Sequence, residues 1–522
     1  MKKTLLFLLT ILAPGLNAQP WQPDLGNGRY KNPIIFADYS DPDAIRVGDD
    51  FYMTASSFNC IPGLPVLHSK DLVNWTIVNH VYDSLPLDKY DKPVHGEGSW
   101  APALRYHDGR YYVYFCTPRD GLFMAVASDP RGEWELNHIE KVEMWEDPCP
   151  LWDDDGSAYL VRSKVCGNEL FLHKMSPDGR RLLDNGVSIF KSETQPTIEG
   201  PKFLKKDGYY YILAPAGGVP QGWQTVLRSR NIYGPYEEKI VLHKGNTEIN
   251  GPHQGGLVET GSGEWWFIHF QDRDMYGRIV HLQPVSWKDG WPLMGVDIDG
   301  DGIGEPVMEY KKPGVGGSFP VRAPQTSDEF DGPSLGLQWQ WHANPKAHWS
   351  SLSAAPGRLR LYAVKNHSQG GNLWFVPNLL LQKFPAPAFT VTAKIDFHGE
   401  SLNEKGGLVV MGETWRFVAL VKGENGLSIE LGKGEFNQCE DKTIVVESVP
   451  LTSGECYLRL EVEEGGVCRF SYSVNGVDFN PIGREGKARK GRWIGAKAGL
   501  FCVNPNIRES SGYMDVDWFR VE

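Results

Sequence analysis

Short runs of alternating apolar and polar residues follow one another along most of this 522-residue chain. Many of these runs are rich in Tyr, Phe, Trp and Val, and clusters of Gly, Asp and Pro separate them. An apolar residue at every second position predicts a β-strand with one buried face, and the intervening clusters predict turns. No stretch shows a sustained helical period. The pattern therefore predicts an all-β protein.

The first part of the chain repeats itself. Five segments begin with a residue followed by proline and continue through a turn signal, such as HDG, DDG or KDG, into an aromatic strand. The prolines are 60, 46, 53 and 51 residues apart, at Pro42, Pro102, Pro148, Pro201 and Pro252. A period near 50 residues with about four short strands per unit is typical of propeller blades. We expect a five-bladed β-propeller over residues 19–310, with a β-sandwich as the alternative.

The composition changes after the repeats. Residues 311–326 are rich in Gly and Pro and are expected to form a linker. Residues 327–522 contain further alternating runs, among them FTVTAKIDF and CYLRLEVEE. These runs predict a C-terminal β-sandwich domain.

The N-terminus has the features of a secretory signal peptide. Lys2 and Lys3 precede a short apolar run from Leu5 to Leu12, and Ala18 is a small residue suited to cleavage. The run is too short to span a membrane. We expect residues 1–18 to be removed and the mature protein to be soluble and exported, to the periplasm of a cell with two membranes or outside the cell.

The charge balance limits the classes of partner. The chain has 53 Lys and Arg against 65 Asp and Glu, a formal net charge of −12. An acidic chain binds poorly to nucleic acid and to anionic membranes, so we expect neither nucleic-acid binding nor membrane insertion. A neutral partner fits better. The sequence leaves the oligomeric state open.

The eight cysteines contain no CxxC pair, so a structural zinc site is not expected. Eight in 522 residues is too few for a disulfide scaffold. We expect buried free thiols, with one or two disulfides left open.

Candidate chemistry lies at the blade starts. In a propeller the first strand of each blade lines the central channel, so these starts converge at one mouth. They carry Asp41, Trp100, Asp147, Glu199 and His253. Three carboxylates around one funnel suit acid–base chemistry on a neutral substrate, and glycoside hydrolysis uses such a pair. The alternative is that each Asp before Pro only caps a turn.

These runs resemble a known family. SDPDAIRVGDDFYMTASSF, GSWAPALRYHDGRYYVYF, EDPCPLWDDDG, IEGPKFLKKDGYYYIL and GRIVHLQPVSWKDGWP are similar to glycoside hydrolase family 43. The resemblance implies a five-bladed propeller that hydrolyses α-L-arabinofuranosyl or β-D-xylosyl linkages with inversion. The C-terminal part resembles the concanavalin- or lectin-like β-sandwich of the β-xylosidase and α-L-arabinofuranosidase branch.

The resemblance also implies roles for individual residues. It makes Asp41 the general base, Glu199 the general acid, and Asp147 the carboxylate that orients the acid and tunes its pKa. It places Arg278 near the acid and the substrate, and His253 in the channel beside a metal or a water. The walls of the sugar pocket are Phe58, Trp100 and Ala101. No organic cofactor is implied.

Two further features are weaker. Trp223, in the segment 216–224, is a candidate sugar platform or a packing residue. Asp297, Asp299 and Asp301 resemble the start of an EF-hand loop, although its twelfth position is Met308. A structural calcium ion is a candidate there, and a polar turn is the alternative. The tryptophans of the C-terminal domain are expected mostly in its core.

The leading hypothesis is an exo-acting glycosidase that removes terminal arabinofuranosyl or xylosyl residues from plant cell-wall oligosaccharides or polysaccharides. In the family branch the sandwich closes one side of the active-site mouth, which favours exo action. Two alternatives remain: an endo-arabinanase with an open groove, and a non-catalytic carbohydrate-binding propeller.

Overall fold

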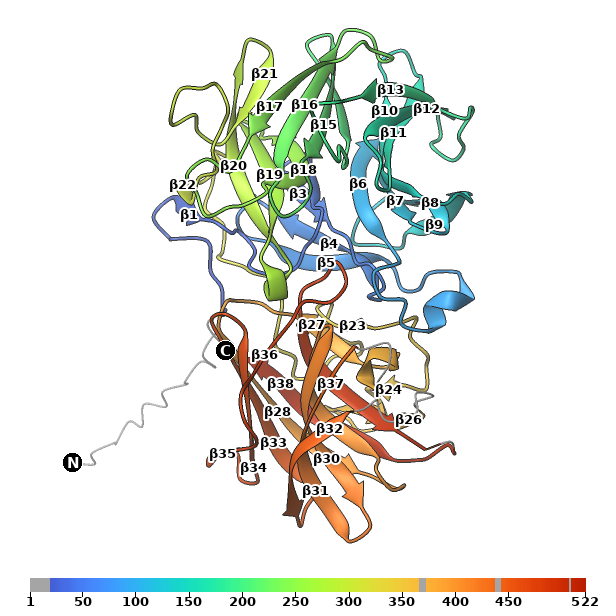
Figure 1. Cartoon of the computed structure of the whole chain (residues 1–522), viewed down its shortest axis with the longest axis vertical. Helices are drawn as coiled ribbons and strands as arrows, with labels where there is room; N and C mark the ends of the chain where they lie inside the picture. The colour runs from blue at the N-terminus through green and yellow to red at the C-terminus, as the bar shows by residue number, and fades with distance from the viewer. Residues whose placement is uncertain (1–18, 366–371, 437–442, 507) are drawn as a thin grey trace, which may run out of the picture.

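A computed structural model describes residues 19–365, 372–436, 443–506 and 508–522. The predicted signal peptide, residues 1–18, lies outside the described residues. Figure 1 shows two bodies one above the other: a propeller, blue to yellow, and a sandwich, orange to red. The all-β prediction is confirmed, because the helices of the described residues are three short 3-10 turns. They are η1 (Asp88–Asp91), η2 (Asp274–Tyr276) and η3 (Leu373–Phe375).

Five four-stranded antiparallel sheets form the propeller blades within the described residues. The strands of each blade pair in chain order. The first two blades are β2 (Asp43–Val47), β3 (Asp50–Thr54), β4 (Gly63–Ser69), β5 (Thr76–Tyr82), and β6 (Trp100–His107), β7 (Arg110–Thr117), β8 (Gly121–Ala127), β9 (Glu135–Glu140). The third and fourth are β10 (Trp145–Trp152), β11 (Ala158–Lys164), β12 (Glu169–Met175), β13 (Val187–Lys191), and β14 (Lys202–Lys206), β15 (Tyr209–Ala216), β16 (Trp223–Ser229), β17 (Glu237–Leu242). The fifth is β18 (His253–Glu259), β19 (Trp265–Asp272), β20 (Arg278–Lys288), β21 (Trp291–Met294).

Each blade begins with the same backbone turn. The residue before the repeat proline has a positive φ in all five blades: Asp41 (53°), Ala101 (32°), Asp147 (54°), Gly200 (58°) and Gly251 (50°). Gly adopts this left-handed conformation freely and Asp tolerates it, which accounts for the residue types found there. Glu199 stands one position earlier than Asp41 and Asp147. The three carboxylates therefore occupy two adjacent positions of the repeat.

The two ends of the propeller segment meet. β1 (Arg29–Lys31) pairs with β22 (Glu309–Lys311) in a small antiparallel sheet. The Gly- and Pro-rich segment that follows lies along the first blade, where the Gln325 side chain bonds to both backbone groups of Ile77. The segment is thus attached to the propeller.

Two eight-stranded sheets pack face to face in the C-terminal part. One contains β23 (Gln340–Trp341), β26 (Val364–Lys365), β27 (Leu380–Lys383), β29 (Lys405–Met411), β30 (Thr414–Gly423), β31 (Gly426–Glu435), β32 (Ile444–Leu451) and β37 (Lys497–Asn504). The other contains β24 (Ser350–Ser351), β25 (Leu359–Tyr362), β28 (Phe389–His398), β33 (Glu455–Glu463), β34 (Val467–Ser473), β35 (Asn480–Pro481), β36 (Gly486–Lys487) and β38 (Tyr513–Val521). Burial alternates along β28 residue by residue, as the sequence predicts.

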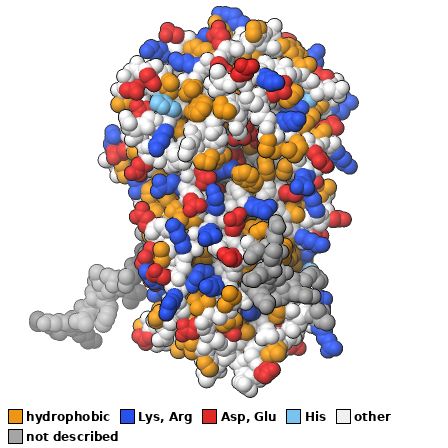
Figure 2. Space-filling view, in the orientation of Figure 1, with side chains coloured by type: hydrophobic (Ala, Val, Ile, Leu, Met, Phe, Trp, Pro, Cys, Tyr) orange, Lys and Arg blue, Asp and Glu red, His pale blue; other side chains and the backbone are white. Residues whose placement is uncertain are grey.

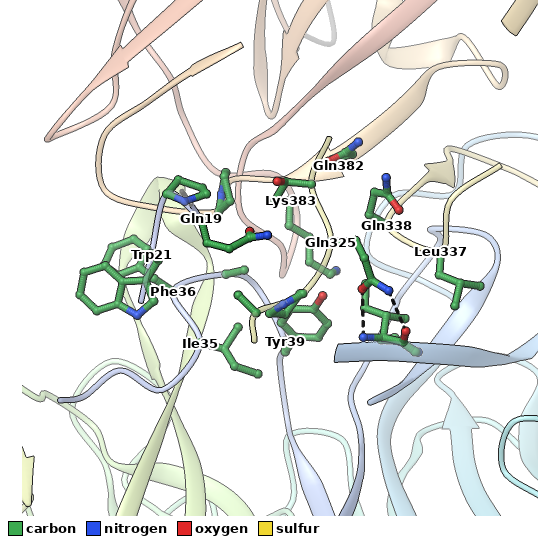
Figure 3. A pocket seen from close by; sticks show the side chains of 18 of the residues that line it. Gln19, Trp21, Ile35, Phe36, Tyr39, Gln325, Leu337, Gln338, Gln382 and Lys383 are labelled. Atoms are coloured by element: carbon green, nitrogen blue, oxygen red, sulfur yellow. Dashed lines mark hydrogen bonds between the residues drawn. The ribbon is translucent and has the colours of Figure 1, made fainter. Parts of the chain in front are cut away.

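The propeller and the sandwich pack against each other, and we call this contact region the joint. The apolar core of the sandwich includes Phe36, Met275, Tyr276 and Ile279 of the propeller. A cavity of about 40 Å³ lies in this joint, between Trp21 and Phe36 on one side and Gln338, Gln382 and Lys383 on the other (Figure 3). Pockets for small molecules measure ~300–1,000 Å³, so this cavity is a packing gap of the joint.

The described cysteines are all free thiols. Six are buried, as expected, but Cys166 is exposed because it lies in the turn after β11. Cys439 lies outside the described residues.

The surface carries charges of both signs. In Figure 2 acidic and basic side chains alternate over the visible face without a continuous basic patch. Within the described residues, no helix combines the length and the apolar character that crossing a membrane requires.

Candidate active site

Asp41 is held by donors from three directions. Its Oδ2 accepts hydrogen bonds from the hydroxyls of Ser40 (2.7 Å) and Ser56 (2.6 Å). Arg278 Nη1 lies 3.1 Å from Asp41 Oδ1. The residue Asp41 is 4% exposed, so water provides little of the stabilisation of its carboxylate. A guanidinium and two hydroxyl donors stabilise the ionised carboxylate that a general base requires.

Glu199 has the opposite surroundings. Burial raises the pKa of Glu199 to about 8, and the nearby carboxylates of Asp147 and Asp41 act in the same direction. Its side chain remains 20% exposed, so a substrate can reach it. A carboxyl group that keeps its proton at neutral pH can act as a general acid.

Asp147 connects the third blade to this acid. Its Oδ2 accepts a hydrogen bond from the backbone N–H of Gly200 (2.7 Å), the residue after Glu199, and another from Ser163 (3.3 Å). Burial and the Asp41 charge raise the pKa of Asp147, while Lys202 opposes them. Asp147 is therefore placed both to hold the backbone at Glu199 and to raise the pKa of the acid.

Arg278 lies against the base and not against the acid. Its guanidinium bonds Ser40 and Asp41 directly, whereas it acts on Glu199 only through space. The backbone N–H of Arg278 donates to Asp38 Oδ1 (2.9 Å), which fixes the start of β20. Arg278 therefore has Asp41 as its direct partner and also acts on the acid through its charge, which lowers the pKa of Glu199 against the effect of burial.

The three predicted pocket-wall residues have different positions. Trp100 is partly exposed, while Phe58 is 3% exposed and packs edge-on against it at 6.2 Å between ring centroids. Ala101 is also buried, and its backbone N–H donates to Ser56 Oγ (2.7 Å). Only Trp100 therefore presents a side chain to solvent, and Ala101 acts by holding the serine that bonds Asp41.

One wall of the site comes from the sandwich. Trp493 is 54% exposed, and its ring centroid lies 6.0 Å from that of Trp100 and 5.8 Å from the Arg278 guanidinium carbon. Beside it lies a groove of about 430 Å³ that Arg278, Val219 and Pro220 of the propeller also line. Five other tryptophans of the sandwich are buried, as expected: Trp339, Trp341, Trp349, Trp374 and Trp415.

Trp223 has a different environment. Its indole N–H donates to Gln195 Oε1 (2.8 Å), and its ring packs with the apolar core of the third and fourth blades. It does not belong to the lining of the groove, to which the same loop contributes Val219 and Pro220. The geometry therefore gives Trp223 a packing role.

His253 lies in the channel next to the acid. Its Nε2 is 3.3 Å from Glu199 Oε1, and the side chain is fully buried. Burial and the neighbouring Arg278 lower the pKa of His253 to about 3, so the imidazole is neutral. Within the described residues, Glu199 is the one acidic side chain paired with it, and no set of three protein ligands includes His253.

The three aspartates of the EF-hand-like run do gather. Carboxylate oxygens of Asp297, Asp299 and Asp301 lie within 4.8 Å of one another. Asp297 also accepts backbone N–H bonds from Gly300 and Gly302, as in a polar turn. This cluster lies in the turn after the fifth blade and shares no contact with the acids of the channel mouth.

Residues 30–292 match the family model described as Glycosyl hydrolases family 43. The chain belongs to glycosyl hydrolase family 43. Residues 327–522 of this family 43 enzyme match the model described as Beta xylosidase C-terminal Concanavalin A-like domain. The family resemblance, the propeller–sandwich fold and the glycoside hydrolase assignment are thereby confirmed.

Relatives of the family 43 chain are named as beta-xylosidases or alpha-L-arabinofuranosidases. A beta-xylosidase of Formosa agariphila is 36% identical over 95% of this chain and 90% of its own length. A non-reducing end alpha-L-arabinofuranosidase of Bacteroides ovatus is 29% identical over 95% of both chains. The crystal structure of a xylan beta-1,4-xylosidase from Bacillus halodurans superposes with a TM-score of 0.82 at 25% identity, over 94% of this chain and 99% of that one.

Sequence reasoning missed three residues of the site: Ser40, Ser56 and Trp493. Ser40 directly precedes Asp41, so the repeat itself could have indicated it. Ser56 lies at the end of the first hairpin and carried no signal. Trp493 could not be found from the sequence, because it reaches the site only through the docking of the sandwich.

Proposed function

We propose that this enzyme is an exo-acting, inverting glycosidase that removes non-reducing terminal β-D-xylosyl or α-L-arabinofuranosyl residues from plant cell-wall oligosaccharides or polysaccharides. The observation that carries the proposal is the contrast between two carboxyl groups in one site. Asp41 is paired with Arg278 and two serines, whereas Glu199 is partly buried beside other carboxylates. Surroundings of this kind separate a base from an acid.

Each of the three carboxyl residues then has a defined role in the reaction. Asp41 takes a proton from a water that attacks the anomeric carbon, and Glu199 gives its proton to the departing glycosidic oxygen. Asp147 holds the backbone beside Glu199 and keeps that carboxyl protonated between turnovers. Both proton transfers use side chains of this chain, so the reaction as proposed requires no organic cofactor.

The sandwich supports the exo assignment. Trp493 and Arg492 line the groove beside Arg278 together with Val219 and Pro220 of the propeller. A wall of this kind limits a long chain lying across the mouth and suits a terminal sugar. An open groove would instead suit an endo-arabinanase.

The remaining proposals concern location and partners. We infer export of the mature protein to the periplasm or the exterior, on the basis of the basic and apolar N-terminal sequence. A plant-derived carbohydrate is the partner that fits a neutral-substrate hydrolase with a net charge of −12.

The test uses two aryl glycosides, an α-L-arabinofuranoside and a β-D-xylopyranoside. We expect turnover of at least one, a loss of at least about 100-fold in Asp41→Ala, and a smaller loss in Glu199→Ala because aryl leaving groups need little protonation. The exposed Asp49→Ala and Glu193→Ala are matched controls and should stay near wild type. Magnetic resonance of the first-formed sugar should show the inverted anomer.

Two results would contradict the proposal. Turnover of neither glycoside would redirect attention to internal arabinan linkages or to binding without chemistry. A first product with retained configuration would exclude the inverting course.

A further inference from the structure

A fourth carboxyl group lies in the active site without a role in the mechanism above. Glu146 is in β10, directly before Asp147, and is 7% exposed. Its carboxyl oxygen lies within 4.8 Å of those of Asp147 and Glu199. The backbone of Glu146 pairs with Ser163 of β11, which fixes its place in the third blade.

The repeat explains why Glu146 reaches this point. It immediately precedes the left-handed residue Asp147 in the third blade, just as Glu199 immediately precedes the left-handed Gly200 in the fourth. Two adjacent blades therefore carry a glutamate at the same repeat position. In the other three blades this position holds Ser40, Trp100 and Asn250.

The charges around the site do not balance an ionised Glu146. Arg278 faces Asp41, and Lys202 acts on Asp147. Over the described ranges, no Lys, Arg or His nitrogen lies within 4.0 Å of the Glu146 carboxyl group. A buried carboxylate without a cation is strongly disfavoured relative to the neutral acid, so the group is expected to keep its proton.

We propose that Glu146 is a protonated positioning residue that orients Glu199 and donates a hydrogen bond to the carboxylate that Glu199 becomes after it has released its proton. The inference rests on the proposed role of Glu199 as the general acid. Burial and the neighbouring carboxylates of Asp147 and Glu199 raise the pKa of Glu146, and a hydrogen bond with the Ser163 side chain opposes them in part. The other titratable groups that face it are the thiols Cys166 and Cys116, neither of which supplies a positive charge.

Two variants separate this role from a structural one. Glu146→Gln keeps the shape, the neutral state and a donor, whereas Glu146→Leu removes the donor. Glu143→Leu, at an exposed position three residues earlier, is the matched control. Each variant is assayed on the pentoside that the wild type hydrolyses, once with a dinitrophenyl leaving group and once with a methoxyphenyl leaving group, which needs more protonation.

The proposal predicts a pattern across these assays. Glu146→Leu should lose about 10- to 100-fold in kcat on the methoxyphenyl glycoside, part of the 10²–10⁴-fold that a positioned acid contributes, and less than about threefold on the dinitrophenyl glycoside. Glu146→Gln should stay within about threefold of wild type on both substrates. The basic limb of the pH profile of kcat/KM should lie at the same pH in Glu146→Gln as in the wild type, since a neutral group replaces a neutral group.

A second measurement reads the proton directly. Infrared difference spectra of the wild type minus Glu146→Gln at pH 7 should contain the C=O band of a protonated carboxyl group. This readout applies even if Glu146→Leu does not fold, and Glu146→Gln can be checked by its melting temperature.

Several results would overturn the inference. An ionised Glu146 would lack that infrared band, and its replacement by Gln would move the basic limb to lower pH because a negative charge beside Glu199 is lost. Equal activity of Glu146→Leu and wild type on the methoxyphenyl glycoside would also refute it. Failure of the proposed function is distinguishable, because then the wild type hydrolyses neither pentoside or Glu199→Ala hydrolyses the methoxyphenyl glycoside as fast as wild type.

Discussion

At the scale of single residues, the site works by giving identical carboxyl groups different surroundings. Asp41 has a guanidinium and two hydroxyl donors, while Glu199 has a partly buried position beside Asp147. The first arrangement stabilises the charged form and the second stabilises the neutral form. The residue type alone therefore does not determine which carboxyl is the acid.

The pKa of Glu199 sets a pH dependence. Because the folded-state pKa is raised to about 8, Glu199 is protonated below that pH and loses its proton above it. For a glycoside with a poor leaving group, kcat/KM should stay high up to about pH 7 and fall as the pH rises through about 8. A pH–rate profile measures this limb. Its presence, unchanged, in Glu199→Gln would contradict the assignment of the limb to Glu199.

At the scale of elements, the turn that opens each blade aims the chemistry. In three blades the left-handed residue before the proline precedes the inner strand, and in β6 and β10 it lies within that strand, where the register shifts. Asp41, Asp147 and Glu199 stand at or directly before this residue. Glycine at two of the five positions suits this conformation. The turn of the fourth blade is also the one whose N–H bonds Asp147.

Gly200 is the sensitive position of this turn. Gly200→Ala would add a Cβ 2.7 Å from the Gln254 side chain, at a φ of 58° that L-residues rarely adopt. The turn must shift, so Glu199 should be misplaced and kcat should fall by about tenfold or more. Steady-state kinetics measures the loss. Gly208→Ala, with a φ of 73° but open space around it, should leave kcat near wild type.

The loop before β37 also contributes to the groove, through Trp493. Trp493 has a φ of 63°, an outlier for so bulky a residue, and such strain occurs at functional sites. If its ring contacts the sugar, Trp493→Ala should raise KM by about tenfold, equal to ~1.4 kcal/mol, and change kcat less than about threefold. Val477→Ala, at another exposed apolar residue of the sandwich, is the control. An unchanged KM would remove Trp493 from the site.

At the scale of the whole molecule, propeller and sandwich form one unit. Ile61 and Trp341 exchange backbone hydrogen bonds, Lys497 Nζ lies 2.9 Å from Cys60 Sγ, and the sandwich core contains propeller residues. Asp38 joins the two parts at the site: its Oδ1 accepts from Arg278 N and its Oδ2 from Gly495 N, both at 2.9 Å. One buried carboxylate thus positions Arg278 and the loop of Trp493.

This joint gives a prediction for Asp38→Ala. Two buried N–H groups would lose their acceptor, at a cost of about 1–3 kcal/mol each, which for a chain of this size lowers the melting temperature by about 2–6 °C in all. Activity should fall as well, because Arg278 and Trp493 lose a common support. Calorimetry and kinetics on the same samples measure both effects, with Asp49→Ala as the control. Normal activity with normal stability would show that the joint does not position the site.

The sequence by itself determined the strands, the five repeats and the sandwich, because a period of two and a period near 50 are local properties of the chain. It also indicated Asp41, Asp147 and Glu199, since they stand one or two positions before the repeat proline. Only the tertiary structure decided that Arg278 pairs with Asp41, that Glu146 faces Glu199, and that Trp493 reaches the groove. These contacts join segments up to 457 positions apart, as between Gly495 and Asp38, and depend on how blades and domains pack, which no local pattern records.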